Sequence, residues 1–388
     1  MPEYTEAATL YVAGFKFEDW ETVWVQRRYN EPDHNFRFTA AERDDPEYFT
    51  LMKFIPGDSC EIELAGQLAV SGVILTRQIA YEATNHQVML IGKGRTFWAA
   101  TSSVIHDTMD FSNKNVLQIA KEVWAPHPVG VKVIGQLDLR PFESAHAEQG
   151  ETTWDFVERL CRPRGVILGS DHLGNFLMIG EHTGEVVHHL IEGVNILRMQ
   201  CVISKQQIYH PYIVSGQTKR SDESSPRQAG QQRAQTDGTA PLFRPRLTPA
   251  EQPVADMSEI QARSRNEAKW GEGTSIEATV TVQGWLNPST NKLWEPGELI
   301  QVDSPMALLS QALKIEIATF TQDRNSGSLT TLELKAPWAL NDSTNANVGN
   351  AGAPQAPGEA KNTLNDMPQI PPAHNPDNPA GEITERGG

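Results

Sequence analysis

The sequence predicts a mainly β protein with an α+β insert. Two observations support this fold class. Strand-like runs, with alternating apolar and polar residues or with many β-branched residues, fill residues 1–95 and 276–337. Apolar residues at helical spacing are confined to the middle of the chain and to one segment before residue 271. The length of 388 residues allows two or three domains of about 150 residues each.

Composition excludes several classes of protein. The formal charge of −16, from 49 acidic and 33 basic residues, argues against a general affinity for nucleic acid, so DNA should pass rather than adhere. The three cysteines, Cys60, Cys161 and Cys201, are too few and too far apart for a disulfide framework or a CxxC metal site. We find no leader pattern and no apolar run of about 18 residues, and we therefore expect neither a signal peptide nor stable membrane insertion.

Residues 1–95 are expected to form a first β domain. Six strand-like runs are separated by Gly, Asn, Asp and Pro: TLYVAG, ETVWVQRRY, FRFTAAE, CEIELAG, SGVILTRQIAYEA and HQVMLIGKG. Six short strands in such a stretch indicate a sandwich or a barrel.

Residues 96–200 are expected to form an α+β module. One helix is predicted before Pro126, because an apolar face at helical spacing consists of Val116, Ile119, Ala120, Val123 and Trp124. A second helix is predicted after an N-cap at Thr152 or Thr153, with Phe156, Val157, Leu160 and Cys161 on one face. The run GVILGSDHLGNFLMIG predicts a hairpin that turns near residues 171–174.

Residues 201–340 are expected to form a second β domain. A strand in IYHPYIVSGQT precedes a polar, proline-rich exposed loop over residues 218–256, and Asp256 and Glu259 have the capping-box spacing for a helix over 257–270. Ile276, Ala278, Val280 and Val282 alternate with polar residues, which predicts a strand. LKIEIATF and SLTTLELKAP predict a hairpin that turns through TQDRNSG.

The stretch WEPGELIQVDSP (Trp294 to Pro305) predicts one turn and one strand. Pro296 and Gly297 occupy the second and third positions of a type II turn, because proline presets φ and glycine tolerates a positive φ. Ile300 and Val302 then alternate with Leu299, Gln301 and Asp303, the period of a strand with two different faces. The segment 341–388, in contrast, has few apolar residues and is expected to be a disordered tail unless a partner holds it.

No motif supports a cofactor or a metal. GKGRT (residues 92–96) resembles a phosphate-binding loop, but its glycine spacing does not fit GxxxxGK[ST]. A zinc site could be drawn from His182, His188 and His189, beside Glu181 and Glu185. Without an HExxH motif or a cysteine pair, a solvated polar strand is the better interpretation.

No motif supports catalysis either. The pattern around Glu42, Asp44 and Asp45 is typical of a charged turn rather than of paired glycosidase carboxylates. There is no GxSxG motif, and Cys161 lies on a predicted buried helix face, where cysteines are usually inert. Three tryptophans within or near strand patterns are expected to pack rather than to bind sugars or bases: Trp20, Trp24 and Trp98. We assign no catalytic, cofactor-binding or metal-ligating residue.

A succession of phrases carries a family resemblance. In chain order they are EDWETVWVQRRYNE, FRFTAAE, GQLAVSGVILTRQIAYEATNHQVMLIGKGRT, SNKNVLQIAKEVW, GETTWDFVERLCRPRGVIL, YHPYIVSGQT, GWLNPSTNKLWEPGELIQVDSP and GSLTTLELKAPWAL. Together they resemble the baseplate hub proteins of Mu-like phages (tail protein P), a family grouped with late control protein D and with the hub half of type VI secretion spike proteins. The resemblance covers residues 1–340, whereas the 218–256 loop and the 341–388 tail carry little of it.

The resemblance implies a homotrimer in which each chain contributes two tube-like small β-barrel domains to a pseudo-six-fold ring. Such a ring would be a structural adaptor between the six-fold tail tube and the three-fold membrane-piercing spike, with a channel for DNA. Implied partners are the tail spike protein, the distal tail tube ring, the tape measure protein and inner baseplate proteins. The place of action would be the virion tail baseplate, after assembly in the host cytoplasm.

Two other functions stay open at the level of sequence. A peptidoglycan-degrading tail enzyme would need a carboxylate or metal constellation, which we do not find. The hub half of a type VI secretion-like spike would usually continue into a β-helical domain. The polar 341–388 segment therefore favours a hub that works with a separate spike protein.

Overall fold

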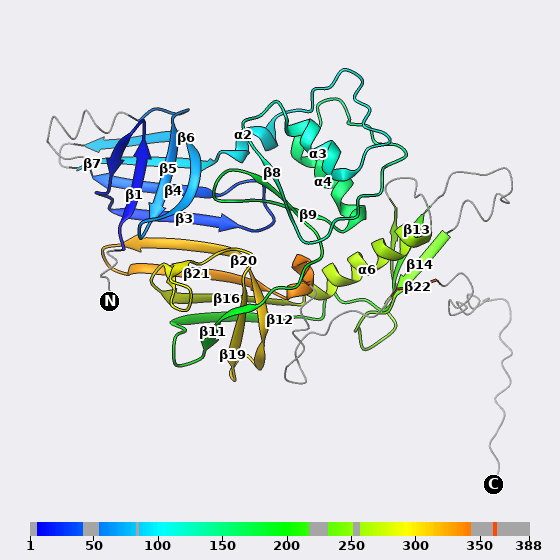
Figure 1. Ribbon diagram of the computed structural model, residues 1–388. Helices are drawn as coiled ribbons and strands as arrows, with labels where there is room; N and C mark the ends of the chain where they lie inside the picture. The colour runs from blue at the N-terminus through cyan, green and yellow to red at the C-terminus, as the bar shows by residue number, and fades with distance from the viewer. Residues whose placement is uncertain are drawn as a thin grey trace, which may run out of the picture.

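The computed structural model describes residues 6–41, 54–82, 85–216, 232–250, 257–342 and 360–362. Thirteen strands share one sheet, shown on the left of Figure 1. Seven come from the start of the chain: β1 (Ala8–Val12), β2 (Phe15–Phe17), β3 (Thr22–Arg28), β4 (Asn35–Ala41), β5 (Ser59–Leu64), β6 (Gln67–Glu82) and β7 (Asn85–Gly94). Six come from later parts: β11 (Val186–Ile191), β12 (Arg198–Ile203), β16 (Ile276–Gln283), β19 (Leu299–Ser304), β20 (Leu309–Asp323) and β21 (Gly327–Lys335).

This continuous sheet corrects the expectation of two separate barrels. Its strand order is β12-β16-β21-β20-β3-β4-β7-β6-β5-β1-β2, with β11 and β19 attached at the side of β20. The described strands do not close the sheet into a barrel, because the order begins at β12 and ends at β2. One hydrophobic core also runs through both halves, from Leu10 and Phe36 to Phe320 and Leu334. The two predicted β domains therefore share one sheet and one hydrophobic core.

The α+β module lies beside the first half of the sheet, at the upper right of Figure 1. It contains α2 (Thr96–Thr101), α3 (Val116–Trp124), β8 (Val131–Ile134), α4 (Thr153–Cys161), the 3-10 turn η1 (Arg162–Arg164), β9 (Ile167–Ser170) and β10 (Phe176–Ile179). Its sheet order is β8-β10-β9. Strand β11, within the expected 96–200 module, and strand β12, which crosses the end of that module, pair instead with β19 and β16 of the main sheet.

The predictions for this module are largely confirmed. All five apolar residues of the first predicted helix face are buried in α3, and Asn115 caps the helix in a capping box with Gln118. The side chain of Thr152 accepts the amide of Asp155 and caps α4. Strands β9 and β10 pair antiparallel across the predicted turn. Helix α2 was not predicted, since its six residues are too few to show helical periodicity.

A small sheet packs on the helix α6 (Met257–Gly273), at the lower right of Figure 1. It has the order β15-β13-β14-β22, from β15 (Arg246–Pro249), β13 (Tyr212–Gly216), β14 (Gln232–Thr236) and β22 (Ala360–Asn362). Strands β14 and β15 correct the expectation of an exposed loop over 218–256, of which residues 218–231 and 251–256 lie outside the described residues. The predicted helix 257–270 is confirmed and extends to Gly273.

Two parts of the expected 341–388 tail belong to the fold. Strand β22 pairs with β14. Asn341 and Asp342 follow the 3-10 turn η2 (Pro337–Leu340), and the amide of Asp342 donates to Pro337 O at 3.1 Å. The rest of that tail lies outside the described residues.

The turn predicted at 295–298 is confirmed. The amide of Glu298 donates to Glu295 O at 3.2 Å, and Gly297 has a φ of +97°. Strand β19 follows with Ile300 and Val302 fully buried. A two-stranded ribbon, β17 (Leu286–Asn287) and β18 (Lys292–Leu293), precedes the turn.

Candidate assembly site

Five strands from each half of the main sheet share one topology. We call β3, β4, β5, β6 and β7 the first β unit, and β12, β16, β19, β20 and β21 the second β unit. The sheet order is β5-β6-β7-β4-β3 in the first unit and β19-β20-β21-β16-β12 in the second. All neighbours in both units are antiparallel. The strands also follow one another along the chain in the same order, so the second unit repeats the first.

An irregularity in strand pairing confirms the equivalence. The long hairpin β6–β7 has a register shift between Ile74 and Thr76. The corresponding hairpin β20–β21 has a register shift between Ile315 and Ile317. Such bulges bend a strand and increase its twist, so both units have a bend at the same place in the same strand.

The first unit is joined to the second by strand pairing of β3 with β20. Residues 309–314 of β20 pair with β19, and residues 317–323 of the same edge pair with β3. Val25 and Phe320 face each other at this joint, and both side chains are fully buried. Gln26 Nε2 donates to Thr319 Oγ1 at 3.1 Å across it. The joint is therefore a packed and hydrogen-bonded interface.

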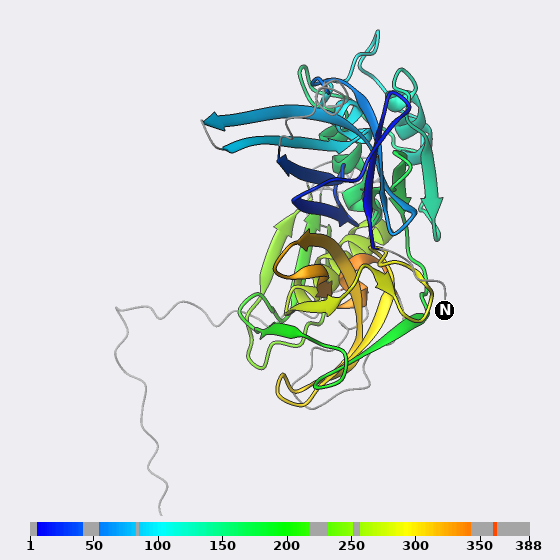
Figure 2. The ribbon, with the colours of Figure 1, turned by 90° about the vertical axis from the view of Figure 1, so that its left-hand side faces the viewer.

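Among the described strands, none pairs with the equivalent edge of β6 beyond its bulge. Residues 67–73 of β6 pair with β5, but beyond the bulge β7 is the one described strand that pairs with residues 76–82. Two large side chains of this segment lie in solvent, with exposed fractions of 54% for Ile79 and 81% for Tyr81. Figure 2 shows this end of the hairpin projecting from the body of the molecule. An exposed strand edge is a template for another strand.

A second open edge lies on β12. This strand pairs with β16 on one side and ends the strand order of the sheet. Val202 is 50% exposed, whereas Met199, Cys201 and Ile203 are partly buried against the main core. Burial raises the pKa of the Cys201 thiol. Within the described residues, the chain thus presents an open edge at β6 and another at β12.

A buried polar cluster fixes the α+β module against both units. Arg27 of β3 is almost completely buried, and its guanidinium donates to Glu295, from the turn before β19, and to His172 Nδ1 at 3.2 Å. His172 lies between β9 and β10 of the module. Nearby, burial lowers the pKa of His34 to about 3, so its ring stays neutral, and its Nδ1 accepts the amide of Arg28 at 3.2 Å. Arg27 of the first β unit, Glu295 beside the second β unit and His172 of the α+β module therefore meet in this cluster.

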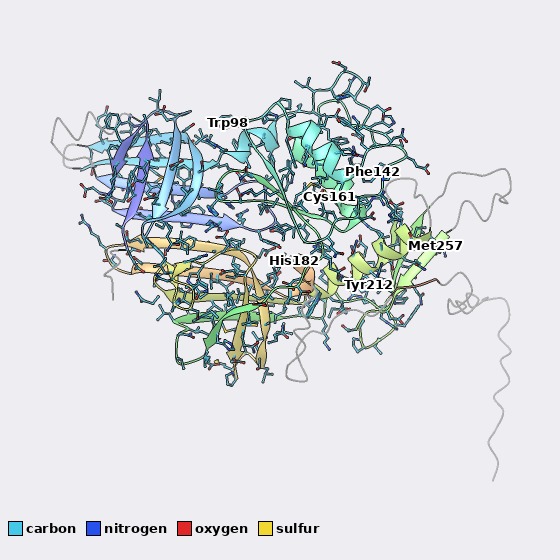
Figure 3. All side chains as sticks on the ribbon, viewed as in Figure 1. Trp98, Phe142, Cys161, His182, Tyr212 and Met257 are labelled. Carbon is cyan, nitrogen blue, oxygen red and sulfur yellow. The ribbon has the colours of Figure 1, made fainter. Side chains whose placement is uncertain are left out.

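A second buried cluster lies at the end of the main sheet. Lys314 Nζ of β20 is 3.1 Å from Asp342 Oδ2, with both side chains fully buried, and it donates to His182 Nε2 at 2.7 Å. Burial lowers the pKa of Lys314, and Asp342 opposes that shift. His182 is labelled in Figure 3 near the centre of the molecule. The cluster ties Asp342 into the fold.

The histidines of the suggested zinc site do not converge. His182 contacts Lys314, whereas His188 Nδ1 lies 2.7 Å from Ser289 Oγ, and His189 points to the other face of β11. Within the described ranges, no group of three potential metal ligands is present.

The glycine that opens GKGRT (residues 92–96) is explained by core packing. A Cβ at Gly92 would lie 2.1 Å from the ring of Phe36, so the core requires glycine there.

The other residues considered from sequence lie as follows. Trp20 packs on Phe38 with ring centroids 4.8 Å apart, and Arg37 covers Trp24 at 5.7 Å. Trp98 on α2 is 51% exposed (Figure 3). Cys161 is fully buried, and its pKa is raised by burial, as expected for an inert cysteine. The carboxylates of Glu42, Asp44 and Asp45 lie outside the described residues.

Sequence reasoning missed the open edges. One signal was available, because the run SGVILTRQIAYEA places Ile79 and Tyr81 well beyond the residues that a short neighbouring strand could cover.

None of the described helices is long and apolar enough to cross a membrane.

Comparisons with known proteins agree with this architecture. Residues 7–94 match a family described as Mu phage baseplate assembly protein GpP-like, N-terminal, and residues 100–181 match Baseplate hub protein gp44-like, second domain. The chain is 23% identical to baseplate hub protein gp44 of Escherichia phage Mu over 342 residues, which covers 85% of this chain and 88% of that protein.

Two solved structures have a similar fold. The 43 kDa tail protein of prophage MuSo2 from Shewanella oneidensis matches with a TM-score of 0.75 and 23% identity, over 86% of this chain and 99% of that one. A chain of the Francisella PdpA-VgrG complex matches with a TM-score of 0.52 and 10% identity, over 86% of this chain and 58% of that one. With its repeated β units, its α+β module and these matches in order along the sequence, the chain resembles the baseplate hub proteins of Mu-like phages.

Proposed function

We propose that three copies of this chain form a ring at the hub of a contractile tail baseplate, and that the ring acts as an adaptor between parts of different symmetry. The observation that carries the proposal is the repetition of one five-stranded unit within the chain. Two equivalent units in each of three copies would give six similar positions around a three-fold axis. Closed rings with cyclic symmetry are a common form of protein assembly.

The same chain also supplies features that are not repeated. Among the described residues, the α+β module and the small sheet on α6 each occur once, and three copies would place them with three-fold symmetry. The repeated units suit contact with the six-fold distal ring of the tail tube, and the single features suit a three-fold spike protein. Under this proposal the tape measure protein and inner baseplate proteins are further partners.

The domain division supports the same proposal. Residues 1–95 and 201–340 would be the two ring-forming parts, with 96–200 as a module beside them, except that β11 and β12 contribute to the second part. The sheet path β12-β16-β21-β20-β3-β4-β7-β6 contributes eight strands per copy, and closed sheets with many strands enclose a wide channel. A net charge of −16 would let DNA pass without adhering.

We infer that the protein works without catalysis, in the virion after assembly in the host cytoplasm. Support comes from relatives that carry the names of hub and tail proteins. A zymogram on bacterial cell walls tests this: a clear lysis band from the purified chain, absent from a mock purification, would contradict the structural role.

The ring itself is tested by light scattering and by negative-stain class averages of the purified protein. A mass of three chains and averages with a central hole are the expected results. A chain that stays monomeric at high concentration and in the presence of spike protein would overturn the proposal.

A further inference from the structure

We propose that copies of the chain are joined by antiparallel pairing between the open edge of β6 in one copy and the open edge of β12 in the next. This inference rests on the proposed three-copy ring and specifies its seam. The second copy is the occupant because the molecule already contains the same joint once, between β20 and β3. Strand β6 is the equivalent of β20, and β12 is the equivalent of β3.

The equivalence fixes a register for the seam. Stepping across the first unit from the residue after the bulge, Thr76 pairs with Ile91, Ile91 with Arg37, and Arg37 with Trp24. The same steps across the second unit give Ile317, Glu333, Thr279 and Gln200. Gln200 is therefore the equivalent of Trp24, and Cys201 is the equivalent of Val25.

The internal joint then transfers directly to the seam. Phe320 pairs with Val25 inside the chain. Ile79 lies three residues after Thr76, as Phe320 does after Ile317, so Ile79 should pair with Cys201 of the next copy. In the same register Tyr81 faces Met199, and Glu82 faces Arg198.

The side chains at these positions complement each other. Ile79 and Tyr81 are exposed apolar residues, and they would cover Cys201 and Met199, which are partly buried against the core. Val88, the partner of Ile79 on β7, is already buried, so the seam would continue an existing apolar face. Glu82 and Arg198 would place opposite charges in direct register, which favours cross-strand pairing.

Strand pairing at the seam would bury Ile79, which is exposed in the single chain. At the internal joint, Phe320 and Val25 are both fully buried, whereas Ile79, the equivalent of Phe320, is 54% exposed in the single chain. Strand pairing in the ring would make the two positions alike. The edges at β6 and β12 would both disappear, which removes the hazard that open strand edges carry.

A disulfide tests the register. Residues that face each other in an antiparallel pair have Cα atoms about 4.5–5.5 Å apart, which lies within the range that a disulfide requires. Ile79→Cys should therefore crosslink to the native Cys201 of the neighbouring copy under mild oxidation. The expected result is a ladder up to covalent trimer on a non-reducing gel, which reductant abolishes.

Two variants serve as matched controls. Ile79→Cys combined with Cys201→Ser should give no ladder, because the native partner is gone. Gln78→Cys lies on the same strand, but its side chain points to the other face, so it should crosslink far less. Equal ladders from Gln78→Cys and Ile79→Cys would show random collision and overturn the seam.

Light scattering on the same samples separates failure of the seam from failure of the ring. A trimer in which Ile79→Cys does not crosslink would overturn the β6–β12 seam and leave the proposed function intact. A persistent monomer without crosslinks would contradict both. A trimer that gives the expected ladder, with little or no ladder from the two control variants, would support both the seam and the ring.

Charge reversal gives an independent test. Glu82→Arg should raise the protein concentration at half-assembly by about tenfold, because it places two cations opposite each other. The double variant Glu82→Arg, Arg198→Glu should restore assembly. Glu61→Arg, an exposed acid on β5 away from the seam, is the control and should leave assembly unchanged. Failure of the double variant to recover would contradict the register.

Discussion

Lys314 and Asp342 show at the scale of single residues how the end of the fold is held. Both side chains are removed from solvent, and removing the cation would leave a buried carboxylate without its main partner. We expect Lys314→Met to lower the free energy of unfolding by about 3–5 kcal/mol in urea titrations. The exposed pair Lys16 with Glu18 is the control, and Lys16→Met should lower the free energy of unfolding far less, because solvent screens this pair. Similar losses for both variants would contradict the role given to burial.

Glu298 predicts a pH dependence. Burial raises the pKa of its carboxyl from 4.5 to about 7 in the folded chain. Between these values the unfolded chain has released the proton and the folded chain has kept it, so this group makes the fold less stable as pH rises from about 4.5 to 7. In Glu298→Gln the free energy of unfolding should no longer fall over this pH range through this group, a difference of at most about 3 kcal/mol. Its plot against pH should therefore be flatter. An unchanged plot would contradict the assignment.

The turn at 295–298 is the element that the sequence predicted most completely, because proline and glycine act through local backbone geometry. Its packing could not be predicted. A Cβ on Gly297 would lie 2.5 Å from the ring of Tyr29, which is far away in the sequence. We expect Gly297→Ala to lose more than about 2 kcal/mol of unfolding free energy, from a positive φ plus this clash. Gly327→Ala is the matched control, because its φ is also positive but no atom lies within 4 Å, and it should lose only about 1 kcal/mol.

Other elements show the limits of sequence patterns. The helix α3 was predictable because its buried face and its capping box lie within ten residues. Strands β14 and β15 were not, because both form by pairing with β13, which their own polar sequence does not indicate. The open edges at β6 and β12 depend on which strands fail to pair. No local sequence pattern indicates which strand edges stay unpaired.

At the scale of the whole molecule, the pairing of β3 with β20 joins residues as far apart as Gln26 and Thr319. The repeat was not visible in the sequence, because the two units share strand order while Ile79 and Phe320, or Cys201 and Val25, differ in identity. Topology can persist when side chains diverge, since backbone hydrogen bonds define the sheet.

The shared sheet predicts cooperative unfolding of the two β units. We expect one calorimetric transition for the unmodified chain, because the units share a core and a strand ladder. Val25→Pro should remove ladder hydrogen bonds at the joint and separate the transition into two. Two transitions in the unmodified chain would show instead that the units are independent.

The covalent linkage of two equivalent units has a consequence for how such a ring can vary. In a ring of six identical subunits, every mutation appears six times, so all positions around the circle must stay alike. In the ring of three chains that we propose, a mutation in one unit would appear at alternate positions only. The two halves of the gene can therefore diverge, one keeping the match to a six-fold neighbour while the other acquires features that a three-fold neighbour recognises.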